Sequence, residues 1–256
     1  MLKLLINIFD LFFLKLIKNK KIKTFLMRRL IKDHITRSID ILKALDLEDF
    51  IIVDVGACKG EEKDTTQRFN RAFPDKEIYA FEPFSGSYKK LLVNTNKIKN
   101  IKPYDIALSD YKGESKFYIT DTVSSSSLLK TEQSEINKIL DEFSASLKCV
   151  ENAEIVKVDR LDNIIKDKII GILKIDTQGS ELSVLRGSEK ILNNIAIVVL
   201  ENNNHKVYTN SSKYYETDDY LRNNGFDLYD IIPSMYSSGR LYEWDSIYIN
   251  SLMEKK

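Results

Sequence analysis

Apolar residues follow two patterns along the chain, and the change falls near residue 50. Before it, apolar side chains recur every three or four positions, which predicts an amphipathic helix. These residues are Ile35, Ile39, Leu42 and Leu45. The segment 50–55 is instead a continuous apolar run, rich in β-branched residues, with one acid near its end. Such runs are typical of strands buried on both faces of a parallel sheet.

Three further apolar runs, at 77–81, 169–175 and 195–200, predict strands of the same kind. Amphipathic stretches lie between the first runs, so predicted strands and helices alternate. This alternation predicts the α/β class, with a mainly parallel central sheet flanked by helices. In such sheets ligands bind at the carboxyl ends of the strands, so we expect functional residues there.

A long segment interrupts this alternation after residue 113. It contains a predicted hairpin strand at 116–119, the polar run 122–127 and a predicted helical stretch at about 132–147. Long connections near strand ends often carry function, so we interpret this one as an insertion that could cap a site.

Composition and charge narrow the class of protein. The 256 residues are 43% hydrophobic and 30% charged, which excludes disordered and collagen-like chains. The net charge of +1 hides an asymmetry, because residues 1–32 carry nine basic side chains and one acidic side chain. The remaining chain is acidic, so we expect no nucleic-acid partner. Two cysteines cannot form a disulfide framework, which favours a reducing, cytoplasmic setting.

Residues 1–46 are predicted to form a basic, amphipathic helical extension. Its apolar stretch 4–17 would be about 21 Å long as a helix, too short to cross a bilayer. Three interpretations of residues 1–32 stay open: packing on the domain or on a second copy of the chain, peripheral contact with the inner face of a membrane, or targeting. A cleaved signal peptide is disfavoured, because lysines rather than small residues follow the apolar stretch.

Candidate binding residues gather after the first two predicted strands. Gly56 and Gly60 lie before a helix expected to start near Glu61, where a ligand could approach the backbone closely. Their spacing matches neither the dinucleotide fingerprint nor the phosphate-binding loop. Asp54 precedes the loop, and Glu82 follows the second strand, where an acid can accept hydrogen bonds from ribose hydroxyls. Acidic groups favour a nucleoside cofactor with positive charge over a pyrophosphate.

Three motifs resemble those of a known family. They are Val-Asp-Val-Gly-Ala-Cys-Lys-Gly at 53–60, Ala-Phe-Glu-Pro at 80–83, and Leu-Lys-Ile-Asp-Thr-Gln-Gly-Ser-Glu at 173–181. Together they make the chain similar to class I S-adenosylmethionine-dependent methyltransferases, and more closely to the FkbM family, over residues 51–250. The resemblance implies a Rossmann-like methyltransferase domain at 47–252, with S-adenosyl-L-methionine as the cofactor.

The resemblance also implies a set of cofactor-binding residues. They are Asp54, Gly56, Ala57, Cys58, Gly60, Glu82, Pro83 and Ala107. Among them, Glu82 would hold the ribose hydroxyls and Ala107 would lie near the adenine. The family commonly has Asn at the position of Cys58, so we expect contacts from the backbone there rather than from the side chain.

Candidate catalytic residues follow the third and fourth predicted strands. Asp176 and Glu201 should face one crevice, because the carboxyl ends of neighbouring parallel strands meet at one edge. They could orient or deprotonate a substrate hydroxyl, or bind magnesium together with Asn202. His205, in the polar loop that follows, could be the general base instead, or a loop residue without a chemical role. The other histidine, His34, is expected at the surface.

These observations predict an enzyme that transfers the methyl group of S-adenosylmethionine to a hydroxyl oxygen. By the family resemblance, we expect the acceptor to be a sugar, a glycan or a related metabolite. Two alternatives remain: a non-catalytic cofactor-binding scaffold in a glycan-modifying assembly, and an N- or protein methyltransferase. The chain lacks the Asn-Pro-Pro-Tyr signature of amide and base N-methylation, which favours oxygen as the acceptor atom.

Overall fold

The computed structural model describes residues 33–132, 137, 149–204, 207–237 and 239–254. Residues 1–32, most of the helical stretch predicted at 132–147, and His205 lie outside this part of the chain. The three interpretations of the extension therefore stay predictions. No helix among the described residues is long and apolar enough to cross a membrane.

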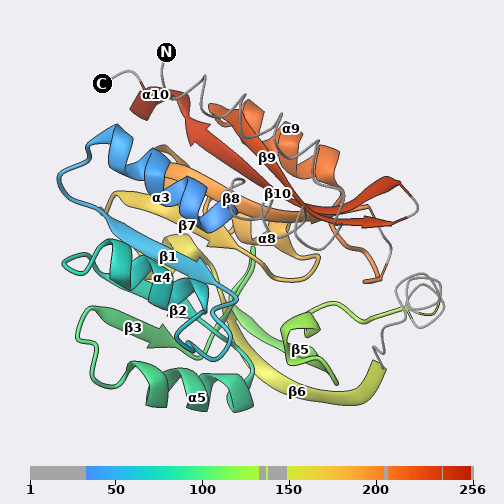
Figure 1. Ribbon diagram of the computed structural model, residues 1–256. Coiled ribbons are helices and arrows are strands. Elements are labelled where there is room, and N and C mark those ends of the chain that lie inside the picture. The colour runs from blue at the N-terminus through green and yellow to red at the C-terminus, as the bar shows by residue number, and fades with distance from the viewer. Residues whose placement is uncertain (1–32, 133–136, 138–148, 205–206, 238, 255–256) are drawn as a thin grey trace, which may run out of the picture.

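A seven-stranded sheet forms the centre of the fold, with the strand order β3-β2-β1-β7-β8-β10-β9 (Figure 1). The strands are β1 (Ile51–Val55), β2 (Ile78–Phe81), β3 (Ile101–Tyr104), β7 (Ile170–Ile175), β8 (Ile195–Asn203), β9 (Phe226–Ser237) and β10 (Arg240–Asn250). The first five in this order run parallel, while β10 runs antiparallel to both of its neighbours. The α/β class with a mainly parallel central sheet is therefore confirmed.

A second sheet of three strands has the order β4-β6-β5. The strands are β4 (Ala107–Leu108), β5 (Gly113–Thr120) and β6 (Cys149–Asp159). β5 contains the strand predicted at 116–119. In Figure 1 the small sheet lies beside the carboxyl ends of the parallel strands, so it adds a wall at the edge where ligands are expected.

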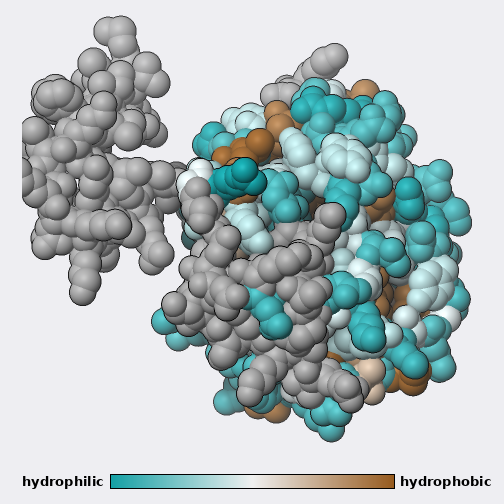
Figure 2. All heavy atoms as spheres, turned by 90° about the vertical axis from the view of Figure 1, so that its right-hand side faces the viewer, coloured by the Kyte–Doolittle hydropathy of each residue, from teal (hydrophilic) through white to brown (hydrophobic). Residues whose placement is uncertain are grey.

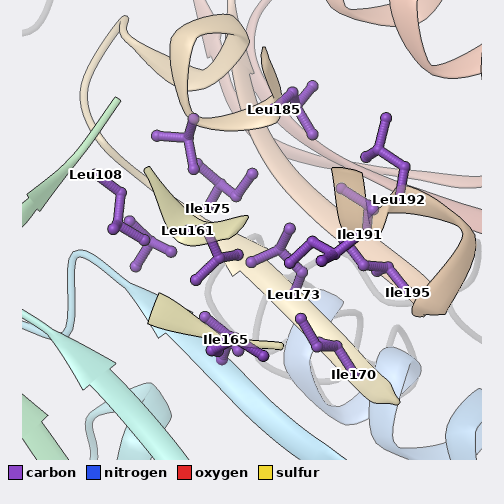
Figure 3. Close-up of a cluster of buried hydrophobic side chains, with 14 of the residues drawn as sticks. Leu108, Leu161, Ile165, Ile170, Leu173, Ile175, Leu185, Ile191, Leu192 and Ile195 are labelled. Carbon is purple, nitrogen blue, oxygen red and sulfur yellow. The ribbon is translucent and has the colours of Figure 1, made fainter. Parts of the chain in front are cut away.

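Helices cover both faces of the main sheet. They are α3 (His34–Leu45), α4 (Thr65–Ala72), α5 (Ser85–Thr95), α7 (Leu161–Ile164), α8 (Glu181–Arg186), α9 (Tyr214–Asn223) and α10 (Ser251–Glu254), with the 3-10 helices η1 (Val123–Ser125) and η2 (Glu189–Asn194). One hydrophobic cluster joins α3, α4 and α5 to one face. A second cluster joins α7, α8, η2 and α9 to the other face, where Leu161, Leu185 and Leu192 lie around Leu173 of β7 (Figure 3).

Helix α4 begins later than the sequence indicated. Its expected start was near Glu61, but residues 61–64 form a turn instead. In this turn the Glu61 N–H donates to Asp64 Oδ2, and the Asp64 N–H donates to Glu61 O, both at 2.8 Å. A longer loop therefore separates β1 from its helix.

Helix α3 belongs to the hydrophobic core, although the sequence pattern placed it in the extension. Its buried residues Ile35, Ile41 and Leu42 share a cluster with side chains of the main sheet. Gly171 of β7 makes room for this packing, since a Cβ there would lie 2.9 Å from Leu42 and 2.7 Å from the ring of Phe50. The helix is thus packed on the domain that was predicted to begin at residue 47.

Polar contacts hold the start of α3 against the edge of the sheet. His34, expected at the surface, is half-buried, and its Nδ1 lies 2.7 Å from Asp245 Oδ2 on β10. Arg37 Nε donates to Asp230 Oδ2 on β9 at 2.9 Å. These contacts join the N-terminal side of the described chain to its last two strands.

We expect Leu42→Ala to lower the free energy of unfolding by about 2–5 kcal/mol, because a cavity replaces a fully buried side chain. Ala44→Gln, at an exposed position of the same helix, should change it by about 0.5 kcal/mol or less. Urea unfolding of the full chain measures both values. Small, equal effects would show that α3 does not stabilise the domain.

Candidate functional site

A cavity opens at the carboxyl ends of β1, β2 and β7. It encloses about 680 Å³, part of which is open to solvent, a volume suited to a cofactor-sized ligand. Its walls come from the loop after β1, the end of β2, the start of α5, the small sheet, residues 123–128 of the predicted insertion, and the segment after β7. The described surface on this side of the molecule is mainly hydrophilic, with apolar residues in separate small areas (Figure 2).

The loop after β1 approaches the end of β7 so closely that only glycine fits at position 56. Gly56 has a φ of 80°, and a Cβ on it would lie 2.1 Å from the carbonyl oxygen of Asp176. The Asp176 N–H also donates to Val55 O at 3.1 Å. Gly56 and Asp176 both line the cavity, and they form one continuous part of its wall.

Glu82, which follows β2, is held by backbone N–H groups. The Cys58 N–H donates to Glu82 Oε2 at 2.8 Å, and the Phe84 N–H donates to Oε1 at 2.9 Å. Cys58 has a φ of 54°, in the left-handed region that Asn adopts more readily than Cys. Although Glu82 lines the cavity, it is largely buried, and burial raises its pKa to about 7 against the opposing effect of the two hydrogen bonds.

Lys174 of β7 is a buried cation beneath the cavity. Its Nζ lies 3.3 Å from Asp54 Oδ1, 3.5 Å from Asp176 Oδ2, and 3.4 Å and 3.3 Å from the carbonyl oxygens of Val55 and Gly56. Burial lowers the pKa of this amine, but the neighbouring carboxylates outweigh burial and shift it upward. Lys174 lies in the motif at 173–181, but no role was assigned to it from the sequence. A lysine inside a buried apolar run was the available signal, because lysine is rarely buried unless it is paired.

The structure places the eight residues expected at the cofactor in two groups. Those that line the cavity are Gly56, Cys58, Glu82, Pro83 and Ala107. Asp54, Ala57 and Gly60 are not part of its lining. The Asp54 side chain is fully buried and accepts a hydrogen bond from Thr66 Oγ1 at 2.6 Å. Ala57 packs in the core, and Gly60 packs against Leu91 of α5.

Gln178 joins the acids at the ends of β7 and β8. Its Nε2 donates to Asp176 Oδ1 at 2.8 Å and to Glu201 Oε2 at 2.6 Å. The hydroxyl of Tyr208 lies 2.9 Å from Gln178 Oε1 and 2.8 Å from the carbonyl oxygen of Ser125, and can donate to either. The structure thus brings Asp176 and Glu201 within reach of one side chain. Gln178 belongs to the motif at 173–181, but no role was assigned to it or to Tyr208 from the sequence, because Glu201 and Ser125, which they contact, lie far from them along the chain.

The two acids have different environments. Asp176 lines the main cavity, whereas Glu201 lines a separate, smaller one of about 220 Å³. Burial raises the pKa of Glu201 well above its ordinary value, and the nearby carboxylates, first that of Asp176, raise it further. A role for His205 as the base stays a prediction, because this residue lies outside the described chain.

Magnesium binding by Asp176, Glu201 and Asn202, one of the two roles left open by the sequence, is not supported by the arrangement of these side chains. Neighbouring residues of a strand point to opposite faces, so the Asn202 side chain turns away from Glu201. Its Nδ2 donates to Leu200 O at 3.1 Å and to Ser246 Oγ at 3.0 Å. Within the described ranges, no three His, Cys, Asp or Glu residues form a group that could hold a metal ion.

One buried polar atom in the cavity wall makes no hydrogen bond to the described chain. It is Ser87 Oγ of α5, and the residue is only 1% exposed. Buried hydroxyl groups nearly always have a partner, so a ligand is the expected partner here. Ala107, Leu108 and Phe117 add an apolar surface to the same cavity.

The sheet order and the position of the cavity define a Rossmann-like α/β protein with its site at the carboxyl ends of the parallel strands. A family model described as the methyltransferase FkbM domain matches residues 54–228. The chain therefore belongs to the FkbM methyltransferase family, which confirms the resemblance of its motifs. No curated protein matches the chain.

The chain also has similarity to several solved structures. The methyltransferase FkbM from Methylobacillus flagellatus KT is 15% identical with a TM-score of 0.49, and the match covers 80% of this chain and 45% of that one. An rRNA methylase from Streptococcus thermophilus is 12% identical with a TM-score of 0.46, over 86% and 98% of the two chains. TrmK from M. capricolum, in complex with S-adenosylhomocysteine, is 11% identical with a TM-score of 0.44, over 83% and 67%. The chain thus matches less than half the length of the FkbM structure.

Glu82 should make the protein less stable as the pH rises from about 5 to 8. Its pKa is about 7 in the fold, against roughly 4.3 in an unfolded chain, so between these values the folded state binds more protons. The free energy of unfolding then falls with rising pH. Urea unfolding across this range should show a smaller fall for Glu82→Gln, even if the amide destabilises the protein at every pH by leaving one backbone N–H without an acceptor. Identical slopes for the two proteins would contradict the raised pKa.

Proposed function

We propose that this chain transfers the methyl group of S-adenosyl-L-methionine to a hydroxyl oxygen of a sugar, a glycan or a related metabolite. Membership of the FkbM family supports methyl transfer. The observation that carries the cofactor assignment is the carboxylate of Glu82, which lines the cavity with both oxygens oriented by backbone N–H groups. The acceptor class follows from the family resemblance of the motifs.

The cavity suits the adenosine part of this cofactor. The oriented carboxylate of Glu82 can accept hydrogen bonds from both ribose hydroxyls. Ala107 and Phe117 offer an apolar surface for the adenine ring, and Ser87 Oγ offers a hydrogen bond that the described chain leaves unused. Gly56 adds a wall without a side chain, which allows close approach to the backbone.

When bound, the cofactor supplies a methyl group activated by a sulfonium. Residues beside it have to orient the acceptor hydroxyl and take its proton, because a protonated hydroxyl is a poor nucleophile. Asp176 lines the cavity and can orient the hydroxyl by accepting its hydrogen bond. Glu201, which lines the adjacent smaller cavity, could take the proton of the acceptor hydroxyl in its ionised form, and its raised pKa would make that form a stronger base. Gln178 keeps the two carboxyl groups at a fixed separation.

Calorimetric titration with S-adenosylmethionine tests the cofactor assignment. Glu82→Ala should weaken binding by about 1–3 kcal/mol, because a charged hydrogen-bonding partner is lost. For the unmodified protein, affinity should rise as the pH increases through about 7, since the ionised carboxylate accepts hydrogen bonds with both oxygens. Glu62→Ala removes an exposed acid from the loop before α4 and should bind normally. Normal affinity in folded Glu82→Ala would rule out the assignment.

A catalytic test first needs the acceptor, which mass spectrometry of glycans from cells with and without the protein should reveal as a methylated sugar. With that acceptor, Glu201→Gln should lower turnover by about 10²–10⁴-fold while cofactor binding persists, because the proton acceptor is lost. A chelator should have no effect.

Other outcomes of this test would identify a different base, a metal-dependent reaction or a different function. The same loss in His205→Ala, with full activity in Glu201→Gln, would make His205 the base. Arrest by the chelator and recovery with magnesium would show a metal-dependent route. Cofactor binding without transfer to any glycan would favour the scaffold, and methylated nitrogen or protein would favour an N- or protein methyltransferase.

A further inference from the structure

The wall around Asp176 carries an excess of negative charge. Asp176 is its accessible member, with a side chain that is 35% exposed and lines the cavity. Behind it, Asp54 contacts Lys174, and Glu201 accepts a hydrogen bond from Gln178. This group of contacts therefore contains one amine, that of Lys174, and three carboxyl groups, those of Asp54, Asp176 and Glu201. With Glu201 protonated, and with Asp54 kept ionised by its ion pair with Lys174, the group keeps a net negative charge.

This wall lies on the side of the cavity where the sulfur of a bound donor is expected. Glu82 is placed to hold the ribose, and Ala107 and Phe117 to face the adenine. The sulfur is bonded to the ribose at the end away from the adenine. Gly56 and Asp176, which are in direct contact with each other, form part of the wall that remains for it, next to lining residues from 123–128 and 177–180.

The geometry points to Asp176 as the residue that sets the affinity for the charged methyl donor relative to its neutral product. The inference rests on the proposed function, because it requires S-adenosylmethionine in this cavity. The donor carries a sulfonium and the product a thioether, while their adenosine and amino-acid parts are the same. A carboxylate in a partly buried wall attracts the sulfonium more strongly than it would in water, and gives no such attraction to the thioether. Methyl transfer thus removes the charge that Asp176 attracts, which favours release of the product.

Lys174 limits this preference, because its charge offsets part of the negative charge of the wall. Removing this amine alone would leave Asp54 buried without a counter-charge and would destabilise the fold. The combination Asp54→Asn with Lys174→Met removes one charge of each sign and leaves the net charge of the wall unchanged. An asparagine at this position can still accept the hydrogen bond of Thr66.

Calorimetry with S-adenosylmethionine and S-adenosylhomocysteine tests the inference without an acceptor. Asp176→Asn should weaken binding of the sulfonium compound about tenfold more than binding of the thioether, because one attractive charge is lost near the sulfur. The asparagine oxygen can still accept from Gln178, so the network stays in place. The Asp54→Asn/Lys174→Met protein should keep the ratio of the two affinities within about twofold of the unmodified value. Ser87→Ala should weaken both ligands equally, since it removes a contact to their common adenosine part.

The outcomes separate this inference from the proposed function. Failure of the unmodified protein to bind either compound would refute the cofactor assignment. Binding of both compounds with an unchanged affinity ratio in Asp176→Asn would overturn the inference alone. A large change of the ratio in the charge-balanced double variant would also contradict it. If that variant does not fold, the ratio measured for Asp176→Asn decides.

Discussion

The ion pair between Lys174 and Asp54 connects β1 and β7, two of the three strands that border the cavity. The residues are direct partners across β1 and β7, and the same amine contacts the carbonyl oxygens of Val55 and Gly56 and the carboxylate of Asp176. A buried charge is costly unless it is paired, and removal of one partner typically costs about 3–5 kcal/mol. The loop after β1 and the end of β7 are therefore held together, and the cavity between them has a defined shape.

Left-handed backbone conformations give this cavity its hydrogen-bonding groups. Cys58 and Gln178 adopt φ values of 54° and 58°. At the first, the backbone N–H reaches Glu82, and at the second, the side-chain amide reaches both Asp176 and Glu201. Such conformations are uncommon in residues with a side chain and cluster at functional sites. Their position at the ends of two neighbouring strands agrees with a site that spans both.

The core was largely predictable because its signals are local. The runs 50–55, 77–81, 169–175 and 195–200 contain the strands β1, β2 and β7 and most of β8, which are buried. The sequence also predicted helix α3, but it did not predict that this helix packs on the main sheet. An amphipathic pattern shows that one face will be buried without showing against what, and the partners of α3 lie on β7, β8 and β10, far along the chain.

By itself the sequence determined the fold class, the glycine loop and the acids at the strand ends, because apolar periodicity and short motifs act over a few residues. Only the tertiary structure decided which acids border the cavity. Asp54 lies within its strand and faces Thr66 of α4, whereas Glu82 follows its strand and turns into the cavity. The contacts of Lys174, Gln178 and Tyr208 likewise arise from strand register and from loops that meet in space. Apart from the contacts of Lys174 and Gln178 with nearby Asp176, these contacts join segments more than twenty residues apart, and no local pattern encodes how such segments pack against one another.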